Sequence, residues 1–341
     1  MSQEIIHGDC LHEMRMFSDN HFSGIVTDPP YGLQFMGKHW DQQVPGKEYW
    51  KEMLRICKPG SHLLAFGGTR TYHRLACAIE DAGWEIRDCL QWIYATGFPK
   101  SHNHFGIEGF GTALKPAYEP ILLCMKPIDG TFAQNAEKWG QAGININGCR
   151  IGTNELRPYS PGLHKVSPSS FNDDSWQGKD QIKSAPSGRW PANIIFDEEA
   201  GEMLDEQSGI LKSGQRKGFL TGQSVNEVYG KRAAKNVNQF DSSEGGASRF
   251  FYCAKASSSE RGEENTHPTV KPLKLMEYLL KLISPPKDAI ILDPFAGSGT
   301  TLLAAKNLGI SCIGIEKEEA YCEIIRGRLN VKQLDFMEAL A

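Results

Sequence analysis

A segment near the start of the chain carries residue types that suit the binding of an amine. Asp-Pro-Pro-Tyr-Gly occupies positions 28–32, shortly after the β-branched pair Ile25-Val26. Prolines lack an N–H and fix φ, so this segment offers a backbone carbonyl acceptor in a rigid turn beside the Asp28 carboxylate. Two acceptors suit the two hydrogens of an NH2 group, and Tyr31 suits stacking on a ring that carries it. The alternative is a strand-terminating turn with a solvent-facing Asp28 and a packed Tyr31.

The same segment suits activation of the amine. An exocyclic amine on a base is a poor nucleophile, because its lone pair is delocalised into the ring. Acceptance of both hydrogens, by Asp28 and by a backbone carbonyl, favours the sp3-like geometry that attack requires. The residues at 28–32 therefore indicate chemistry at nitrogen.

A second segment, near the other end of the chain, has the composition of a ligand-binding loop. Asp-Pro-Phe-Ala-Gly-Ser-Gly-Thr-Thr occupies positions 293–301 and follows the apolar run at 290–292. Gly297 and Gly299 allow a sharp turn and close approach to a ligand, and Thr300 can open a helix with exposed N–H groups. The segment therefore indicates a site for a nucleotide-like cofactor.

What this loop lacks narrows the choice of cofactor. No Lys follows its glycines as a Walker motif requires, and Leu302 stands where a dinucleotide fingerprint has its third glycine. Both nucleotide hydrolysis and NAD binding are therefore disfavoured. Glu316 ends the next expected strand, which suits a carboxylate that accepts hydrogen bonds from ribose hydroxyls. A glycine turn followed by a surface Glu is the alternative.

Both segments follow strand patterns, and these patterns continue on either side. Alternating strand and helix patterns predict an α/β fold with a mostly parallel sheet. Ligands bind at the carboxyl edge of such a sheet, where both segments would lie. The predicted helices cover about 49–57, 70–82, 272–283, 300–308 and a last helix to 329, and the predicted strands end near 26, 66, 94, 125, 293 and 315.

The middle of the chain, residues 127–266, loses this periodicity and is typical of loops. It is too long for a plain linker and predicts an inserted recognition module. Residues 207–240 hold one acidic and six basic residues, which favours contact with phosphates; a solvated surface loop is the alternative. The basic residues are Lys212, Arg216, Lys217, Lys231, Arg232 and Lys235.

The bulk composition limits the remaining classes. A net charge of -4 with 40% hydrophobic residues is that of a globular protein and excludes a wholly basic nucleic-acid coat. No apolar run approaches the about 20 residues of a membrane span, and the polar start lacks a signal-peptide pattern, so we expect no membrane partner and a cytoplasmic protein. The nine cysteines form no Cys-x-x-Cys pair, so we expect buried reduced thiols and no metal.

Three motifs in this order resemble those of the S-adenosylmethionine-dependent DNA amino-methyltransferases. They are the two segments above and His-Pro-Thr-Val-Lys-Pro at 267–272. The order, with the amine motif first and the cofactor motif last, is similar to that of the circularly permuted beta group. The resemblance implies a Rossmann-like fold with a mostly parallel seven-stranded sheet. It also implies three parts: a catalytic half at 1–126, a target-recognition insertion at 127–266 and a cofactor-binding half at 267–341.

The resemblance assigns a role to each matching position. It implies that a base rotated out of the duplex is held by Asp28, Pro29, Pro30 and Tyr31. For the cofactor S-adenosyl-L-methionine, it implies Asp9 near the adenine, Glu316 at the ribose and Lys271 beside the methionine part. It implies a cofactor lining made by Asp293, Phe295, Gly297, Ser298, Gly299 and Thr300.

Three of the matching positions have ordinary structural alternatives. Taken alone, Asp9 is a helix N-cap and Lys271 an exposed residue at a helix start. Glu119, in Tyr-Glu-Pro at 118–120, also matches a family position, but here we favour an ordinary surface residue.

The amine motif of this family begins with Asp or Ser, and Asp28 favours adenine N6 over cytosine N4. The resemblance therefore implies methyl transfer to N6 of a flipped adenine in double-stranded DNA, with cytosine N4 as the alternative. A homodimer and a cognate restriction endonuclease are further partners that it allows. Three rival classes remain: an RNA or protein amine methyltransferase, a non-catalytic DNA-binding relative and a dinucleotide oxidoreductase. Asp28 and the motif order disfavour the first class, the retained Asp28 disfavours the second, and the missing third glycine disfavours the third.

Overall fold

The computed structural model describes residues 2–33, 43–97, 101, 106–152, 188–212, 225–226, 230–231, 244–254 and 270–338. The chain divides into two compact units. The first comprises Met1–Cys149, Pro191–Met203 and Phe251–Ala341, and the second comprises Arg150–Trp190 and Leu204–Phe250. Both of the chemically informative segments belong to the first unit.

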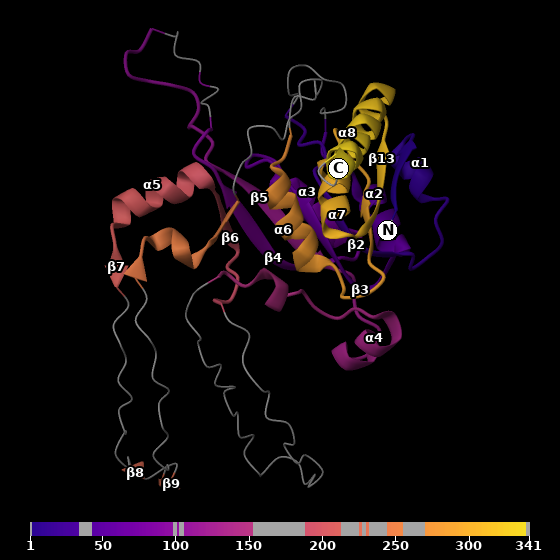
Figure 1. Cartoon of the computed structure of the whole chain (residues 1–341), viewed down its shortest axis with the longest axis horizontal. Helices are drawn as coiled ribbons and strands as arrows, with labels where there is room; N and C mark the ends of the chain where they lie inside the picture. The colour runs from indigo at the N-terminus through magenta and orange to yellow at the C-terminus, as the bar shows by residue number, and fades with distance from the viewer. Residues whose placement is uncertain are drawn as a thin grey trace. The chain divides into compact units, whose positions relative to one another are not determined.

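The first unit is built on a nine-stranded sheet with the order β1-β13-β12-β2-β3-β5-β4-β6-β11 (Figure 1). All neighbouring pairs are parallel except β3–β5 and β4–β5, so β5 is an antiparallel strand within a parallel sheet. The strands are β1 (Gln3–His7), β2 (Phe22–Thr27), β3 (Cys57–Phe66), β4 (Glu85–Ile93), β5 (Tyr118–Met125), β6 (Ile194–Asp197), β11 (Tyr252–Ala254), β12 (Ile290–Asp293) and β13 (Ser311–Glu316).

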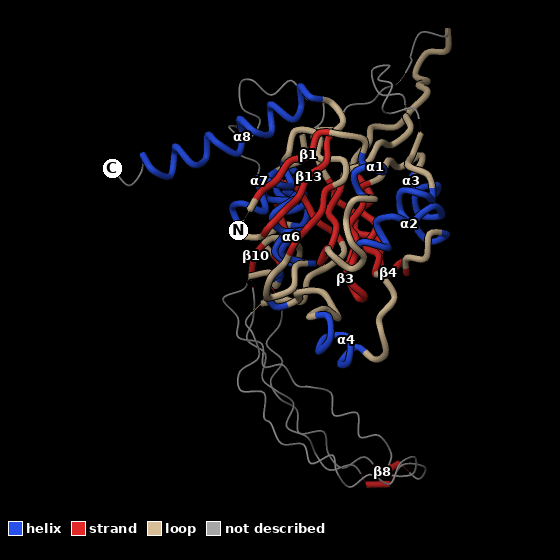
Figure 2. The backbone as a smooth tube through the Cα atoms, turned by 90° about the vertical axis from the view of Figure 1, so that its right-hand side faces the viewer, coloured by secondary structure: helices blue, strands red, loops and turns tan. Residues whose placement is uncertain are grey.

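Helices cover both faces of this sheet (Figure 2). Helices α6 and α7 pack on one face and α1, α2 and α3 on the other, with a separate hydrophobic cluster under each set. No helix among the described residues is both long and apolar enough to cross a membrane. The helices of this unit are α1 (Cys10–Met14), α2 (Lys47–Ile56), α3 (Tyr72–Asp81), α4 (Phe132–Trp139), the 3-10 turn η3 (Asn147–Cys149), α6 (Leu273–Ile283), α7 (Thr300–Leu308) and α8 (Glu319–Glu338).

Alternation along the central strands explains why both faces are covered. Successive side chains of a strand point to opposite faces. In β2, Ile25 packs in the cluster under α1–α3 and Val26 in the cluster under α6 and α7; in β3, Leu63 and Leu64 divide in the same way. A strand that is apolar on both faces is stable only between two layers of helices.

The pairing of β12 with β2 brings the two ends of the chain together. Ile291 lies opposite Gly24 and Leu292 opposite Ile25 in parallel register. The sequence predicted that the strands preceding both chemically informative segments end at one sheet edge, and this is confirmed. From this pair the chain continues in opposite directions across the sheet, from β12 to β13 on one side and from β2 to β3 on the other. Such a switch point is where α/β sheets bind ligands.

The sheet differs from expectation in its number of strands. We expected seven, and the described residues form nine, because β6 and β11 of the 127–266 segment extend the edge beyond β4. These strands have four and three residues, too few to give a periodic pattern. The boundaries proposed at 126 and 266 remain a prediction.

The second unit is organised by two small antiparallel pairings among its described residues. Strand β7 (Leu211–Lys212) pairs with β10 (Glu244–Gly245), and β8 (Val225–Asn226) pairs with β9 (Gly230–Lys231). The carboxylate of Asp205, in α5 (Glu198–Ser208), accepts hydrogen bonds from the backbone N–H and the hydroxyl of Ser248, each at 2.7 Å. Ser248 belongs to the 3-10 turn η4 (Ala247–Phe250). Arg249 donates to backbone carbonyls of this unit, Leu211 at 3.1 Å among them.

Candidate active site

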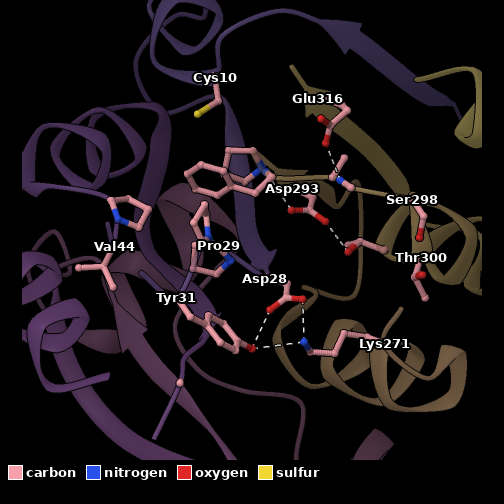
Figure 3. A pocket seen from close by; sticks show the side chains of 18 of the residues that line it. Cys10, Asp28, Pro29, Tyr31, Val44, Lys271, Asp293, Ser298, Thr300 and Glu316 are labelled. Atoms are coloured by element: carbon pink, nitrogen blue, oxygen red, sulfur yellow. Dashed lines mark hydrogen bonds and ion pairs between the residues drawn. The ribbon is translucent and has the colours of Figure 1, made fainter. Parts of the chain in front are cut away.

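Four neighbouring strands end in carboxylates that line one cavity. Asp9 follows β1, Glu316 ends β13, Asp293 ends β12 and Asp28 follows β2. Because these strands are parallel, their carboxyl ends meet at one edge, and the four residues line a cavity of about 1010 Å3. Figure 3 shows three of them, Asp28, Asp293 and Glu316. This volume lies at the upper end of small-ligand pockets, which suits two ligands side by side.

Asp28 is held by two partners inside this cavity. Its Oδ1 accepts a hydrogen bond of 2.8 Å from the Tyr31 hydroxyl, and its Oδ2 lies 2.7 Å from Nζ of Lys271 (Figure 3). Pro29 and Pro30 line the cavity beside it. The Asp28 side chain is 23% exposed, so it does not face open solvent as in the ordinary-turn alternative.

Glu119 joins this group, although we expected an ordinary surface residue. Its Oε2 accepts from the Tyr31 hydroxyl at 2.8 Å and lies 3.2 Å from Nζ of Lys271. The side chain of Lys271 is 10% exposed, which also excludes the exposed helix-start alternative. The expectation of an ordinary surface residue was wrong for Glu119, and the direction of its strand explains how it reaches this group. In the antiparallel β5 it is the second residue, which places it at the edge where β2 and β3 end.

Electrostatics keep these groups in defined protonation states. Burial lowers the pKa of Lys271, but the carboxylates of Asp28 and Glu119 raise it by more, so Lys271 remains a cation. Burial, and then Asp28 and Glu119, raise the pKa of Tyr31 well above its ordinary value. Tyr31 therefore stays a neutral phenol.

Asp293 is buried between the two segments and supports both. Its carboxylate accepts hydrogen bonds from the Thr27 hydroxyl at 2.8 Å, the Thr301 hydroxyl at 2.5 Å and the backbone N–H of Phe295 at 3.2 Å. Burial raises its pKa to about 6, and these hydrogen bonds oppose the rise. Asp293 thus fixes the start of the glycine-rich loop relative to β2.

The glycine-rich loop is fastened to Glu316. Oε2 of Glu316 accepts from the backbone N–H of Gly297 at 2.8 Å, and its Oε1 accepts from that of Glu318 at 2.9 Å. Gly297 and Gly299 have φ values of 54° and 77°, which side chains rarely adopt. Burial raises the pKa of Glu316. A carboxylate has about four acceptor positions, so Glu316 retains capacity for ligand hydroxyls.

Arg328 holds the same loop from α8, and no sequence pattern indicated it. One of its Nη atoms donates to the carbonyl of Ser298 at 2.5 Å and to the hydroxyls of Ser298 and Thr300, each at 3.2 Å. Ser298 and Thr300 line the cavity, and their predicted position near the cofactor stays a prediction. Their polar side chains therefore have a structural partner outside the cavity.

Asp9 caps a helix, which was the structural alternative for this residue, and it also lines the cavity. Its carboxylate caps α1 by accepting from the backbone N–H groups of Leu11 at 3.1 Å and His12 at 3.3 Å, and it lines the cavity. Phe295 also lines the cavity, with its ring centroid 6.2 Å from that of Tyr49. The cap leaves the other carboxylate oxygen of Asp9, Oδ2, with only Lys317 at 3.9 Å among the described residues.

The basic segment is described only in part. Lys212, in β7, lies 3.3 Å from Glu244, and Lys231 lies in β9. The predicted phosphate contacts Arg216, Lys217, Arg232 and Lys235 lie outside the described residues. A DNA-binding role for these residues remains a prediction.

Comparison with known proteins identifies the family. A family model described as DNA methylase (N6_N4_Mtase) matches residues 22–327. The chain is 36% identical to the type II methyltransferase M.HpaI of Haemophilus parainfluenzae, over 97% of this chain and 75% of that protein. It is 24% identical to the type II methyltransferase M.HindIII of Haemophilus influenzae, over 96% of each. A solved PvuII DNA methyltransferase, described as cytosine-N4-specific, shares the fold with a TM-score of 0.51 at 15% identity, over 96% of this chain and 86% of that chain.

The chain belongs to this DNA methylase family, and it is an S-adenosylmethionine-dependent DNA amino-methyltransferase. The fold is that of S-adenosylmethionine-dependent methyltransferases, as the sequence predicted. The cavity fits the cofactor: Glu316 and Asp9 offer acceptors for hydroxyl and amino groups, and Phe295 offers an aromatic surface. The roles of individual residues are taken up as proposals below.

Proposed function

We propose that this protein methylates the exocyclic N6 amine of adenine at a specific site in double-stranded DNA. The observation that carries the proposal is the position of Asp28. Its carboxylate lines the same cavity as Glu316. Asp28 is also the first residue of the amine motif, where Asp rather than Ser favours adenine. Cytosine N4 is the alternative base, since both bases present an NH2 group next to an aromatic ring.

The amine pocket is assigned to residues 28–31. Asp28 and the backbone carbonyl of Pro29 accept the two amine hydrogens, and Pro30 keeps the turn rigid. The ring of Tyr31 stacks on the base, which offsets part of the few kcal/mol that removal of a base from the duplex costs. The hydrogen bonds of Tyr31 to Asp28 and Glu119 hold its ring in place for this contact.

The cofactor is assigned to the other half of the cavity. Glu316 would hold the ribose hydroxyls, and Asp9 and Phe295 the adenine. Gly297, Ser298 and Thr300 of the glycine-rich loop would line the remainder, together with Asp293. Gly299, which we expected in the same lining, is not among the residues that line the cavity and lies against Ile325 of α8. When bound, S-adenosylmethionine supplies an activated methyl group. The protein then has to orient the amine in line with that group and to exclude water, which requires rigid placement of Asp28. A contact of Lys271 with the methionine part stays a proposal, because its Nζ is held by Asp28 and Glu119.

The remaining partners belong to the same proposal. Lys212, Arg216, Lys217, Lys231 and Arg232 would contact DNA phosphates. A cognate restriction endonuclease is supported only by the naming of the relatives as type II methyltransferases. A homodimer stays a prediction from the family resemblance.

One experiment tests both the activity and the base. Unmodified DNA prepared by amplification is incubated with the protein and with methyl-labelled S-adenosylmethionine, digested to nucleosides and analysed by mass spectrometry. We expect label in N6-methyladenine. Label only in N4-methylcytosine would overturn the choice of base, and absence of label in both would overturn the function. Sequencing that detects modified bases would then give the recognised site.

A further inference from the structure

The hydroxyl of Tyr31 lies between two carboxylates. Its oxygen is 2.8 Å from Oδ1 of Asp28 and 2.8 Å from Oε2 of Glu119. A phenol carries one proton, and an ionised carboxylate only accepts. The hydroxyl can therefore donate to only one of the two carboxylates at a time. The contact with the other carboxylate is a hydrogen bond only when that carboxyl group carries a proton of its own. These three oxygens form a chain with room for one additional proton.

The cluster contains one cationic group and two carboxylates. Lys271 places one positive charge against the two carboxylates, with its Nζ 2.7 Å from Asp28 and 3.2 Å from both Glu119 and the Tyr31 hydroxyl. One net negative charge remains in a largely buried group. The other titratable groups facing it among the described residues are Tyr94, whose pKa burial and then Glu119 raise to about 12, and Asp293.

The reaction proposed above produces a proton in this place. The amine nitrogen uses its lone pair to form the new N–C bond, while the bond from the methyl carbon to sulfur breaks and its electron pair stays on sulfur. The nitrogen then carries a positive charge and must release one N–H proton. Asp28, which accepts that hydrogen, is the nearest base.

We propose that Tyr31 and Glu119 form the exit route for this proton. The N–H proton moves to Oδ1 of Asp28 and on to the Tyr31 oxygen, as the Tyr31 hydroxyl proton moves to Oε2 of Glu119. Asp28 is again a carboxylate, Tyr31 is again a phenol, and Glu119 becomes a carboxylic acid. The Glu119 side chain is 22% exposed at the cavity wall, so it returns the proton to water. Glu119 is thus a positioning residue that acts through Tyr31, and this assignment rests on the proposed function.

Single-turnover methyl transfer tests the route. Tyr31→Phe keeps the ring and removes the hydroxyl, and Glu119→Gln keeps the shape and removes the base. Each should slow transfer by about 10–100-fold, and the double variant should be no slower than the slower single variant, since both interrupt one route. The wild-type rate should fall as the pH falls and the acceptor becomes protonated, and Glu119→Gln should lose or shift this acidic limb.

The matched control is Glu85→Gln, because Glu85 is an exposed glutamate on β4 whose side chain is 46% exposed and pairs with Arg87. It should keep the wild-type rate and pH profile. A wild-type rate and profile in Tyr31→Phe, or losses that multiply in the double variant, would overturn the route. If the wild-type protein methylates neither base, both the proposed function and the proton route are wrong. If the wild-type protein methylates DNA and Tyr31→Phe and Glu119→Gln both match its rate, only the proton route is wrong.

A second measurement needs neither DNA nor cofactor. In protein labelled with 13C in the tyrosine rings, the Tyr31 signal is assigned by its loss in Tyr31→Phe. Wild-type Tyr31 should not titrate below pH about 10, the ordinary value for a phenol. Glu119→Gln removes a negative charge at 2.8 Å and should lower the titration midpoint, whereas Glu85→Gln should not. An unchanged Tyr31 midpoint in Glu119→Gln would overturn the coupling on which the route depends.

Discussion

The hydroxyl of Thr27 donates a hydrogen bond of 2.8 Å to Oδ1 of Asp293, across 266 positions of the chain. Thr27 is the last residue of β2 and stands directly before Asp28, and Asp293 is the last residue of β12 and opens the glycine-rich loop. The bond is buried, so it fixes the amine pocket relative to the cofactor pocket at the point where β2 and β12 lie side by side. Methyl transfer between two bound molecules depends on such fixed placement.

Replacement of Asp28 should separate chemistry from cofactor binding. Asp28→Ala removes a preorganised acceptor of the amine, and we expect methyl transfer to fall by at least about 100-fold. Affinity for S-adenosylmethionine, measured by calorimetry, should change little, because Lys271 retains Glu119 as a partner. Asp81→Ala, at an exposed position that ends α3, is the control and should match the wild type. Normal transfer by Asp28→Ala would contradict the assignment of the amine pocket.

The buried carboxyl of Asp293 should make stability depend on pH. Burial raises its pKa from 3.8 to about 6, so the folded state binds more protons than the unfolded state in this range. Its favourable contribution is complete below pH about 4 and is lost as the pH rises through 6, a change of about 3 kcal/mol. Asp293→Asn cannot titrate, and its amide can donate to Thr301 while its oxygen accepts from Thr27.

The measurement is the free energy of unfolding by urea for both proteins between pH 4 and pH 7. The value for the variant minus that for the wild type should increase by about 2 kcal/mol over this range, somewhat less than the full change, because the unfolded carboxyl is already largely ionised at pH 4. All other titrating groups, Glu316 among them, are shared and cancel. A difference that does not vary with pH would show that Asp293 is ionised in the folded protein throughout.

Arg328 should affect cofactor binding through the loop that it holds. Arg328→Met leaves the carbonyl and hydroxyl of Ser298 and the hydroxyl of Thr300 without this charged donor. We expect about 10-fold weaker binding of S-adenosylmethionine, with kcat reduced by less than about 3-fold, since a hydrogen bond to a charged group is worth about 1.5–3 kcal/mol. Arg326→Met is the control, two residues earlier on α8, where Arg326 pairs with Glu319 and Glu323. Equal losses in the two variants would mean that the loop is not the cause.

The basic segment should govern the salt dependence of DNA binding. Joint replacement of Lys212, Arg216 and Lys217 by Ala should weaken DNA binding and reduce the slope of log K against log salt by about 2–3, since each phosphate that the protein neutralises adds about 0.9 to this slope. Replacement of the exposed Lys281 and Lys287 is the control and should leave the slope unchanged. An unchanged slope in the triple variant would show that the segment does not bind phosphate.

Much of the site followed from local sequence patterns because its residues stand directly after strands. Asp28, Asp293 and Glu316 each follow or end a short apolar run, and parallel strands deliver their carboxyl ends to one edge. The position of Glu119 in the site could not be predicted from local patterns, because the antiparallel direction of β5 is set by the neighbouring strands and not by its own residues. The contacts of Arg328 with the glycine-rich loop could not be predicted either, since the sequence of a helix does not show which distant residues an arginine on it contacts.

The sequence by itself determined the α/β class, the order of the two motifs and the residue types at the sheet edge, because apolar periodicity and turn residues are local properties. Only the tertiary structure decided that Tyr31, Glu119, Lys271 and Asp28 form one charged cluster. It also decided that the sheet continues into β6 and β11. These features depend on strand direction and on contacts between residues far apart in the chain, which are selected by packing of the whole unit.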